Sequence, residues 1–338
     1  MQRVKGPVRV GLIGGGWAAW AHGQGYRQLP DLFRVRYVMD VDAGIAAERA
    51  RDLPGARAVT NARAVLDDPD IDAVDICVPH DLHRPIAIAA AKAGKHVLME
   101  KPLARSYAEG REIVAAAGAA GVQLMIAFNE RHRWCMRTIK RLADEGRLGR
   151  VYMVRSDHHQ NVVKPEGHWL RSKDRSGGGA VIGSGVHLLD LLRWFGGEVS
   201  EVFCTSFHMP DRLEGEVAAS VTVTYAAGGI GTHDIMWATS GKPWYQFLAV
   251  YGTGGRATTF GTDVTFAPID GGLDTLEMPK EGPFTDTFRD ELKHFGECLL
   301  SGARPITDGA DALKTQEIVE AAYRSAETRA VVRLPLAG

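Results

Sequence analysis

Short apolar runs separated by helical stretches mark the first part of the chain. The runs are rich in β-branched residues, as is typical of parallel strands buried on both faces of a sheet. They are Val8–Ile13, a second run ending at Asp40, Ile71–Val78, His96–Met99 and Gln123–Ala127. Helical stretches lie between them at Ala43–Leu53, Asn61–Leu66, His83–Ala93 and Ser106–Ala120. This alternation predicts an α/β fold, a doubly wound parallel sheet, in residues 1–125.

From Val151 the pattern changes to longer segments with alternating or β-branched residues, separated by turn residues. These segments predict a mostly antiparallel sheet and are Val151–His158, Val199–Phe207, Val217–Tyr225, Gly231–Ala238 and Gln246–Tyr251. Helical periodicity is found in Arg131–Glu145, Val186–Phe195, Phe284–Leu300 and Asp308–Thr328. Residues 126–338 are therefore expected to form an α+β domain. One face of its open sheet can join copies of the chain into a homodimer or homotetramer.

A glycine cluster follows the first apolar run. Gly14 and Gly16, with Ala19 three residues later, match the relaxed GxGxxA form of the dinucleotide fingerprint, in which the backbone approaches a pyrophosphate. Trp17 and Ala18 open the helix behind the turn, whose free N–H groups can bind the anion. Asp40, at the end of the second strand, can accept hydrogen bonds from a ribose, which favours NAD over NADP. The alternative is an ordinary glycine turn.

Composition narrows the class of protein. A chain of 338 residues favours two domains, and a net charge of −1 argues against nucleic acid or an anionic membrane as the main partner. The four cysteines have no zinc-ligand spacing, so no metal is expected. The chain has no apolar run long enough for a membrane span and no signal-peptide pattern at its start. We therefore expect a cytoplasmic protein that acts on small molecules.

Polar residues also stand where two buried strands end. In an open α/β sheet the ligand lies beyond the carboxyl ends of the strands, so Pro79, His80, Glu100 and Lys101 should face the cofactor. A lysine beside the nicotinamide can polarise a carbonyl or, with a lowered pKa, move a hydroxyl proton. The alternative for Lys101 is a surface charge before a proline.

The chain resembles the Gfo/Idh/MocA oxidoreductases, which pair a Rossmann domain with a C-terminal α/β domain and oxidise or reduce sugars and polyols. The resemblance runs nearly end to end. It is carried by the glycine turn with His22 after it, Pro79-His80-Asp81-Leu82-His83, Ala93-Gly94-Lys95-His96-Val97 with Glu100-Lys101-Pro102, Asn129 with Arg131, Gly177-Gly178-Gly179 with His187-Leu188-Leu189-Asp190, and the segment from Pro305 to Ser325.

The resemblance implies roles for particular residues. Lys101 is the catalytic lysine, and His187 is the catalytic histidine that acts on the substrate hydroxyl. His83, Glu100 and Asn129 join the cofactor contacts. Histidine also suits this role by its chemistry, because its pKa is closest to neutrality. The alternative for His187 is a structural histidine in a helix.

The chain departs from the family pattern at Gly183, where an aspartate usually stands four residues before the histidine. His80, where many relatives carry asparagine, is a milder departure. Three explanations stay open for Gly183. Another acid such as Asp157 or Glu166 approaches from the second domain, Lys101 and His187 suffice without it, or the chain binds nucleotide without turnover.

Several other residues are candidates for substrate contacts. His168, Trp169 and Arg171 lie on the loop before the glycine triplet, where an indole can stack on a sugar ring and a guanidinium can bond its hydroxyls. The alternative is a packed loop. Of the adjacent His158 and His159, one can line the pocket, but neighbours on a strand point to opposite faces and cannot share a metal. Trp237 and Trp244 are expected in the core or at a contact between copies.

These observations predict an NAD-dependent dehydrogenase of a sugar, polyol or sugar derivative. Two alternatives from other classes remain. One is NAD-assisted glycoside cleavage, in which transient oxidation acidifies a neighbouring C–H and permits elimination. The other is a non-catalytic nucleotide sensor, suggested by Gly183.

Overall fold

The computed structural model describes residues 4–239, 245–276 and 285–336. The chain divides into two compact units, Met1–His132 with Gly282–Leu313, and Arg133–Glu281 with Lys314–Gly338. Each unit therefore contains two separate stretches of chain, whereas the ranges predicted from the sequence, 1–125 and 126–338, are continuous.

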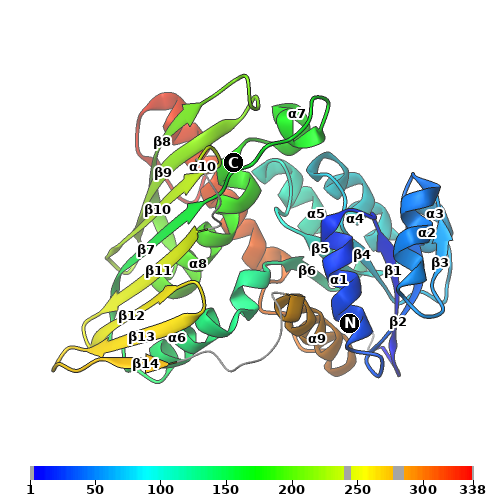
Figure 1. Ribbon diagram of the computed structural model, residues 1–338, viewed down its shortest axis with the longest axis horizontal. Coiled ribbons are helices and arrows are strands. Elements are labelled where there is room, and N and C mark those ends of the chain that lie inside the picture. Colours follow the sequence, from blue (N-terminus) through cyan, green and yellow to red (C-terminus); the bar gives the residue numbers. More distant parts are fainter. Residues whose placement is uncertain (1–3, 240–244, 277–284, 337–338) are drawn as a thin grey trace. The chain divides into compact units, whose positions relative to one another are not determined.

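The first unit contains a six-stranded, wholly parallel sheet in the order β3-β2-β1-β4-β5-β6 (Figure 1). Its strands are β1 (Val8–Ile13), β2 (Phe33–Met39), β3 (Arg57–Val59), β4 (Ala73–Ile76), β5 (His96–Glu100) and β6 (Leu124–Ala127). Its helices are α1 (Trp17–Arg27), α2 (Ala43–Arg51), α3 (Arg63–Leu66), α4 (His83–Lys92) and α5 (Tyr107–Ala120), with short turns η1 (His80–Leu82) and η2 (Asn129–His132). The doubly wound prediction is confirmed. The strand order reverses between β1 and β4, which places the ligand crevice of such sheets there.

A helix from late in the chain completes the core of the first unit. Helix α9 (Thr285–Ser301) packs on α1. Its Leu292, Phe295 and Leu299 are buried in the same cluster as Val8 and Tyr26. Burying three such side chains contributes roughly 5–9 kcal/mol, at about 1.5–3 kcal/mol each. This apolar contact explains why residues 282–313 belong with the nucleotide-binding fold.

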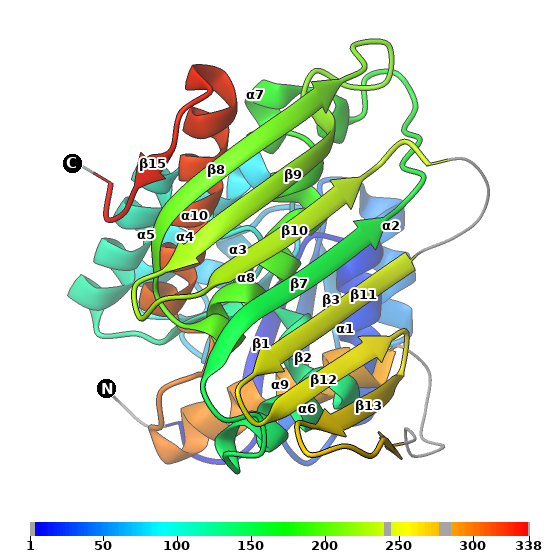
Figure 2. The same cartoon turned by 90° about the vertical axis from the view of Figure 1, so that its left-hand side faces the viewer.

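The second unit contains a nine-stranded sheet in the order β14-β13-β12-β11-β7-β10-β9-β8-β15 (Figure 2). Only the pair β7 and β10 is parallel, so the prediction of a mostly antiparallel sheet is confirmed. The strands are β7 (Val151–His159), β8 (Val199–His208), β9 (Glu216–Tyr225), β10 (Ile230–Met236), β11 (Tyr245–Gly252), β12 (Gly255–Phe260), β13 (Asp263–Pro268), β14 (Asp274–Leu276) and β15 (Val332–Arg333).

The two faces of this sheet differ. Its helical segments are α6 (Trp134–Asp144), η3 (Trp169–Arg171), α7 (Lys173–Ser176), the π-helical turn η4 (Val181–Gly185), α8 (Val186–Gly196) and most of α10 (Gly309–Thr328). Helix α8 packs on β7 and β10. The opposite face is not covered by the described helices of this unit (Figure 2). The register of β8 and β12 places the exposed Phe203, Phe207 and Phe260 on that face. In the described ranges, no helix has the length and apolar character needed to cross a membrane.

Candidate active site

The glycine turn after β1 has the geometry that the fingerprint requires. Gly14 has φ +106°, and a Cβ there would lie 2.2 Å from the carbonyl oxygen of Cys77, so only glycine fits. The Gly15 N–H donates to Asp40 Oδ2 at 2.8 Å, and the Asp42 N–H donates to Asp40 Oδ1 at 2.9 Å. The turn and the Asp40 carboxylate are therefore tied together.

Helix α1 begins directly behind this turn. Gly16 is its N-cap, and a Cβ on Gly16 would meet no atom within 4 Å, so the backbone there is open to a ligand. Trp17, 62% exposed, and Ala18 occupy the first two helical positions, where backbone N–H groups lack helical partners. These donors can bind an anion, while Asp40 offers acceptors at the end of the neighbouring strand β2. The arrangement fits the pyrophosphate and ribose of NAD.

The other predicted cofactor residues follow strands of the same parallel sheet. Pro79 and His80 come after β4, Glu100 ends β5 with Lys101 behind it, and Asn129 follows β6. Because carboxyl ends of parallel strands share one edge, these residues gather at the edge that also carries Gly14 and Asp40.

His83 occupies a more interior position. Its ring is fully buried, with Nδ1 2.9 Å from the Pro102 carbonyl oxygen and Nε2 3.1 Å from the Val78 carbonyl oxygen. Burial lowers the pKa of His83, against a smaller opposing effect of the two carbonyls. His83 thus braces the backbone on either side of the site, and its ring contacts that of His80 at 5.5 Å between centroids.

Lys101 has the electrostatic environment expected of a proton-transfer group. Burial lowers the pKa of its ammonium, and the adjacent Glu100 carboxylate partly opposes this. A lowered pKa increases the neutral amine fraction near pH 7–8, the form that can accept a hydroxyl proton.

In the second unit, His187 lies in the first turn of α8, directly after the π-helical turn η4. Such turns are frequent at functional sites. His187 is half-buried, while the other residues of the first turn of α8 are buried. Asp190, one turn later, accepts a hydrogen bond from Thr315 Oγ1 at 3.0 Å and so ties α8 to α10.

Gly183, the departure from the family pattern, has a steric cause. A Cβ on Gly183 would lie 2.1 Å from Trp237 Cη2, so the indole occupies the space of any side chain at this position. The indole is 3% exposed, and its Nε1 donates to Ser184 Oγ at 2.6 Å. Trp237 is therefore a core residue, while Trp244 lies outside the described residues.

Neither alternative acid is held beside η4. The inner face of β7 and β10 carries Ser156 and His233, bonded Oγ to Nδ1 at 2.9 Å, and His233 Nε2 lies 3.4 Å from the position of a Gly185 Cβ. Asp157 alternates to the opposite face, where its Oδ1 pairs with His159 Nε2 at 3.1 Å. Glu166 is exposed on the loop after β7.

The predicted substrate residues take two kinds of position. His158 is buried on the inner face with Ser156 and His233, and burial lowers the pKa of His233 to about 3. His168 and Trp169 are half-exposed and stacked, with ring centroids 5.7 Å apart.

Arg171 is tied into its loop rather than extended from it. Its guanidinium donates to the Asp211 carbonyl at 2.9 Å, and its own carbonyl accepts from Glu214 N–H. This contact agrees with the packed-loop alternative for that segment.

One polar cluster was not singled out as a site from the sequence. His22, Asp75 and Cys77 are buried together, and among the described residues they are a group of potential ligand atoms within 4.8 Å of one another. The signal that could have found it is Asp75, an acid inside an apolar strand, because a buried carboxylate needs a polar partner.

Comparison with known proteins identifies the family of this chain. The model of the oxidoreductase family with an NAD-binding Rossmann fold matches residues 8–128, and the model of the GFO/IDH/MocA C-terminal domain matches residues 136–258. The chain belongs to the Gfo/Idh/MocA family. It is thus an oxidoreductase with an NAD-binding domain, as the resemblance of its motifs implied.

Individual members of the family are similar at moderate identity. A levoglucosan dehydrogenase from Pseudarthrobacter phenanthrenivorans is 35% identical over 241 residues, which span 68% of this chain and 62% of the relative. A myo-inositol 2-dehydrogenase from Thermotoga maritima is 26% identical over 97% of this chain and 98% of its own. A solved levoglucosan dehydrogenase in complex with NADH and levoglucosan superimposes with a TM-score of 0.91 at 26% identity, covering 98% of this chain and all of that one.

Proposed function

We propose that this protein is an NAD-dependent dehydrogenase that oxidises a ring CH–OH group of a cyclic sugar, an anhydrosugar or a cyclic polyol. The observation that carries the proposal is the shared strand edge of the first unit, where the glycine turn, Asp40 and Lys101 gather. The names of the relatives, levoglucosan dehydrogenase and myo-inositol 2-dehydrogenase, support a cyclic polyhydroxylated substrate.

Each residue has a defined task in this proposal. Bound NAD supplies the hydride acceptor. The Gly14 turn and the start of α1 hold the pyrophosphate, and Asp40 holds the ribose. Lys101, as the neutral amine, accepts the proton of the reacting hydroxyl, and His187 is the second candidate for this proton transfer. His158, His168 and Trp169 contribute to the substrate side.

The proposed function is tested with purified protein, a panel of pyranoses, anhydrosugars and inositols, and either NAD or NADP. We expect NADH absorbance to rise with at least one member, and NAD to be preferred to NADP by about tenfold or more in kcat/KM, because a carboxylate repels a 2′-phosphate. The variant Asp40→Ala should lower the ratio of kcat/KM with NAD to kcat/KM with NADP.

Two other outcomes would refute the proposal. Substrate cleavage that requires NAD without accumulation of NADH would indicate glycoside cleavage by transient oxidation. Calorimetric binding of NADH with no turnover across the panel would indicate a nucleotide sensor.

We also propose that copies of the chain associate through the uncovered face of the second unit's sheet, and that the protein works in the cytoplasm. The open sheet face with its exposed Phe203, Phe207 and Phe260 supports the first point, because a second copy of the chain could cover these apolar side chains. Four buried free cysteines support the second. A monomer mass near 36.7 kDa by light scattering at micromolar concentration would refute the association.

A further inference from the structure

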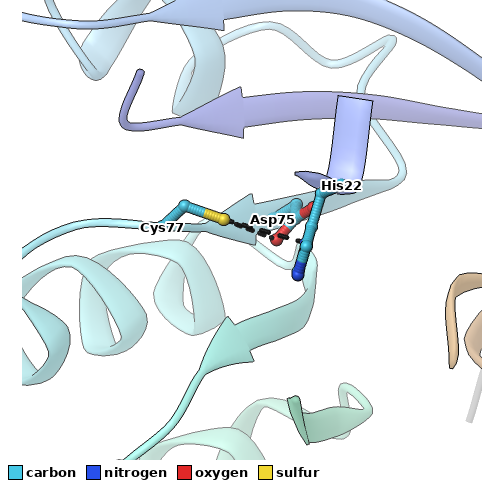
Figure 3. A group of neighbouring side chains, drawn as sticks. All are labelled: His22, Asp75 and Cys77. Atoms are coloured by element: carbon cyan, nitrogen blue, oxygen red, sulfur yellow. Dashed lines mark hydrogen bonds and ion pairs between the residues drawn. The ribbon is translucent and has the colours of Figure 1, made fainter. Parts of the chain in front are cut away.

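A chain of buried polar groups runs through the first unit behind Lys101. His22 on α1 and Asp75 on β4 are both fully buried, with Nδ1 and Oδ2 2.8 Å apart. Tyr26 Oη donates to the same carboxylate oxygen at 2.9 Å, and the Cys77 thiol donates to Asp75 Oδ1 at 3.5 Å. Figure 3 shows His22 and Cys77 directed toward Asp75.

The other nitrogen of the His22 ring points toward the catalytic segment. Nε2 lies 3.4 Å from Glu100 Oε1, and the second oxygen of Glu100 accepts the backbone N–H of Lys101 at 3.1 Å. The Glu100 side chain is only 13% exposed. His22 therefore lies between two carboxylates, and the second of them is bonded to the residue assigned to proton transfer.

The charge states of this network follow from its contacts. Burial alone would lower the pKa of His22, but the Asp75 carboxylate outweighs it and holds the pKa well above its usual value, so the ring is an imidazolium. Burial alone would raise the pKa of Glu100, but the neighbouring His22 and Lys101 cations hold it below its usual value.

Glu291 on α9 also faces the network but stays neutral. Its carboxyl is fully buried and has no hydrogen-bond partner in the part of the chain that the structure describes. Burial raises its pKa well above the usual value, and the negative charges of Glu100 and Asp75 add to this, against the effect of His22. The imidazolium is thus shared by Asp75 and Glu100 alone.

We propose that His22 is a positioning residue for the reaction: held between Asp75 and Glu100, it fixes the Glu100 carboxylate beside Lys101 and so sets the pH range over which Lys101 exchanges its proton. This inference rests on the proposed function, since it concerns the lysine assigned to proton transfer. No direct contact of His22 with substrate or cofactor is involved.

The free-energy cost of burying these charged groups indicates that the network has a role beyond stabilising the fold. Charges buried in a core are weak contributors to stability, and apolar residues of similar volume often stabilise as well or better. Here the charges extend from the middle of the core to Lys101, whose own pKa is lowered by burial and raised by Glu100. His83, which also faces this segment, is kept neutral by burial. The Glu100 carboxylate is thus the charge that raises the pKa of Lys101, and His22 holds this carboxylate in place.

The variants Glu100→Gln and His22→Gln should both lower the pH midpoint at which Lys101 exchanges its proton, by different amounts. Removing the Glu100 charge leaves burial unopposed, so the midpoint should fall by about one unit. Removing the His22 cation releases the Glu100 carboxylate and raises its pKa, so the midpoint should fall by a smaller amount, about half a unit. In the double variant the midpoint should fall no further than in Glu100→Gln alone, because His22 acts on Lys101 only through Glu100, whereas general damage to the fold would add to the shift.

Two measurements report these midpoints. The first is the pH profile of kcat/KM on an active sugar. The second needs no turnover: the rate at which Lys101 reacts with an amine acylating reagent, followed across pH by peptide mass spectrometry on the intact protein. If wild type proves inactive but the acylation midpoints shift as stated, the proposed function fails while the inference holds.

The control variant is His96→Gln. His96 is a buried histidine at the opposite end of β5, where Nδ1 accepts the Gln123 N–H at 3.0 Å. Glu100 lies four positions further along the strand, about 13 Å away at about 3.3 Å per residue. The control variant should leave the Lys101 midpoint unchanged. No shift in His22→Gln, or a further fall when His22→Gln is added to Glu100→Gln, would overturn the proposal.

The charge of His22 is measured without any variant. In protein labelled with ¹⁵N-histidine, both ring nitrogens of His22 should carry protons at pH 8, and a neutral ring would overturn the proposal even if His22→Gln fails to fold. Metal analysis of the purified protein tests the remaining alternative, in which the cluster binds a metal ion. A stoichiometric ion on His22, Asp75 and Cys77 would also overturn it, because a metal-bound ring is neutral.

Discussion

Replacing Lys101 with methionine is expected to lower kcat/KM by about 10³-fold, within the range that positioned acid–base groups contribute. Methionine keeps the length and the apolar stem of lysine but removes the amine that takes the hydroxyl proton. NADH binding should change only a few-fold, because the Gly14 turn and Asp40 lie on other strands of the sheet. Steady-state kinetics and calorimetry with NADH check the two parts separately.

Lys95→Met provides a matched control for this variant. Lys95 is also buried near β5, but its ammonium donates to the carbonyl oxygens of Asp68 at 2.6 Å and Ile71 at 3.0 Å. It caps backbone carbonyls at the end of the sheet opposite the site. We expect Lys95→Met to lower the melting temperature while leaving kcat/KM near wild type. A Lys101→Met enzyme with normal turnover, or an equally inactive Lys95→Met enzyme, would contradict the assignment of Lys101.

The pH dependence of oxidation should follow the neutral amine. Since burial lowers the pKa of Lys101, the active form appears at lower pH than for an exposed lysine. The rate of oxidation should therefore rise with pH through that pKa, and this rise should be absent from the residual activity of Lys101→Met.

The Rossmann half of the fold follows from the sequence because its signals are local. Buried parallel strands are continuous apolar runs, and Gly14, Asp40 and Lys101 each stand at the end of one. The motif around Lys95 shows the limit of such reasoning, because Lys95 and His96 bond backbone groups at the start of β5, while the chemistry proposed for this segment is assigned to Lys101.

What the sequence pattern misses depends on contacts distant in the chain. The apolar face of α9 predicts a helix, but nothing in it tells which core it joins. Strands β12 to β14 are short and separated by glycine turns, so their alternation is weak. The partnership of His22 with Asp75 spans 53 positions. An aspartate inside a buried strand indicates that a polar group lies beside it, but the sequence does not show which residue supplies that group.

The absent acid at position 183 is explained only by the structure, and it leads to a second prediction. Gly183→Asp, which restores the usual family residue, should destabilise the second unit by about 1–3 kcal/mol through overpacking against Trp237. Burial of an unpaired carboxylate adds to this. The expected fall in melting temperature is roughly 4–8 °C for about 2 kcal/mol, measured by calorimetry. Gly118→Ala, at a helical glycine with no atom within 4 Å of its Cβ position, should be neutral or slightly stabilising.

A double-mutant cycle separates the steric cause from a general intolerance of charge. Trp237→Ala removes the indole that fills the space beside Gly183, at its own cost of about 3–5 kcal/mol for a buried tryptophan. In that background Gly183→Asp should cost at least 1 kcal/mol less than in wild type, a coupling of the size found for residues in contact. Equal costs in both backgrounds would show that Trp237 does not exclude the carboxylate. With coupling, the indole at position 237 is the group that excludes an acid from position 183.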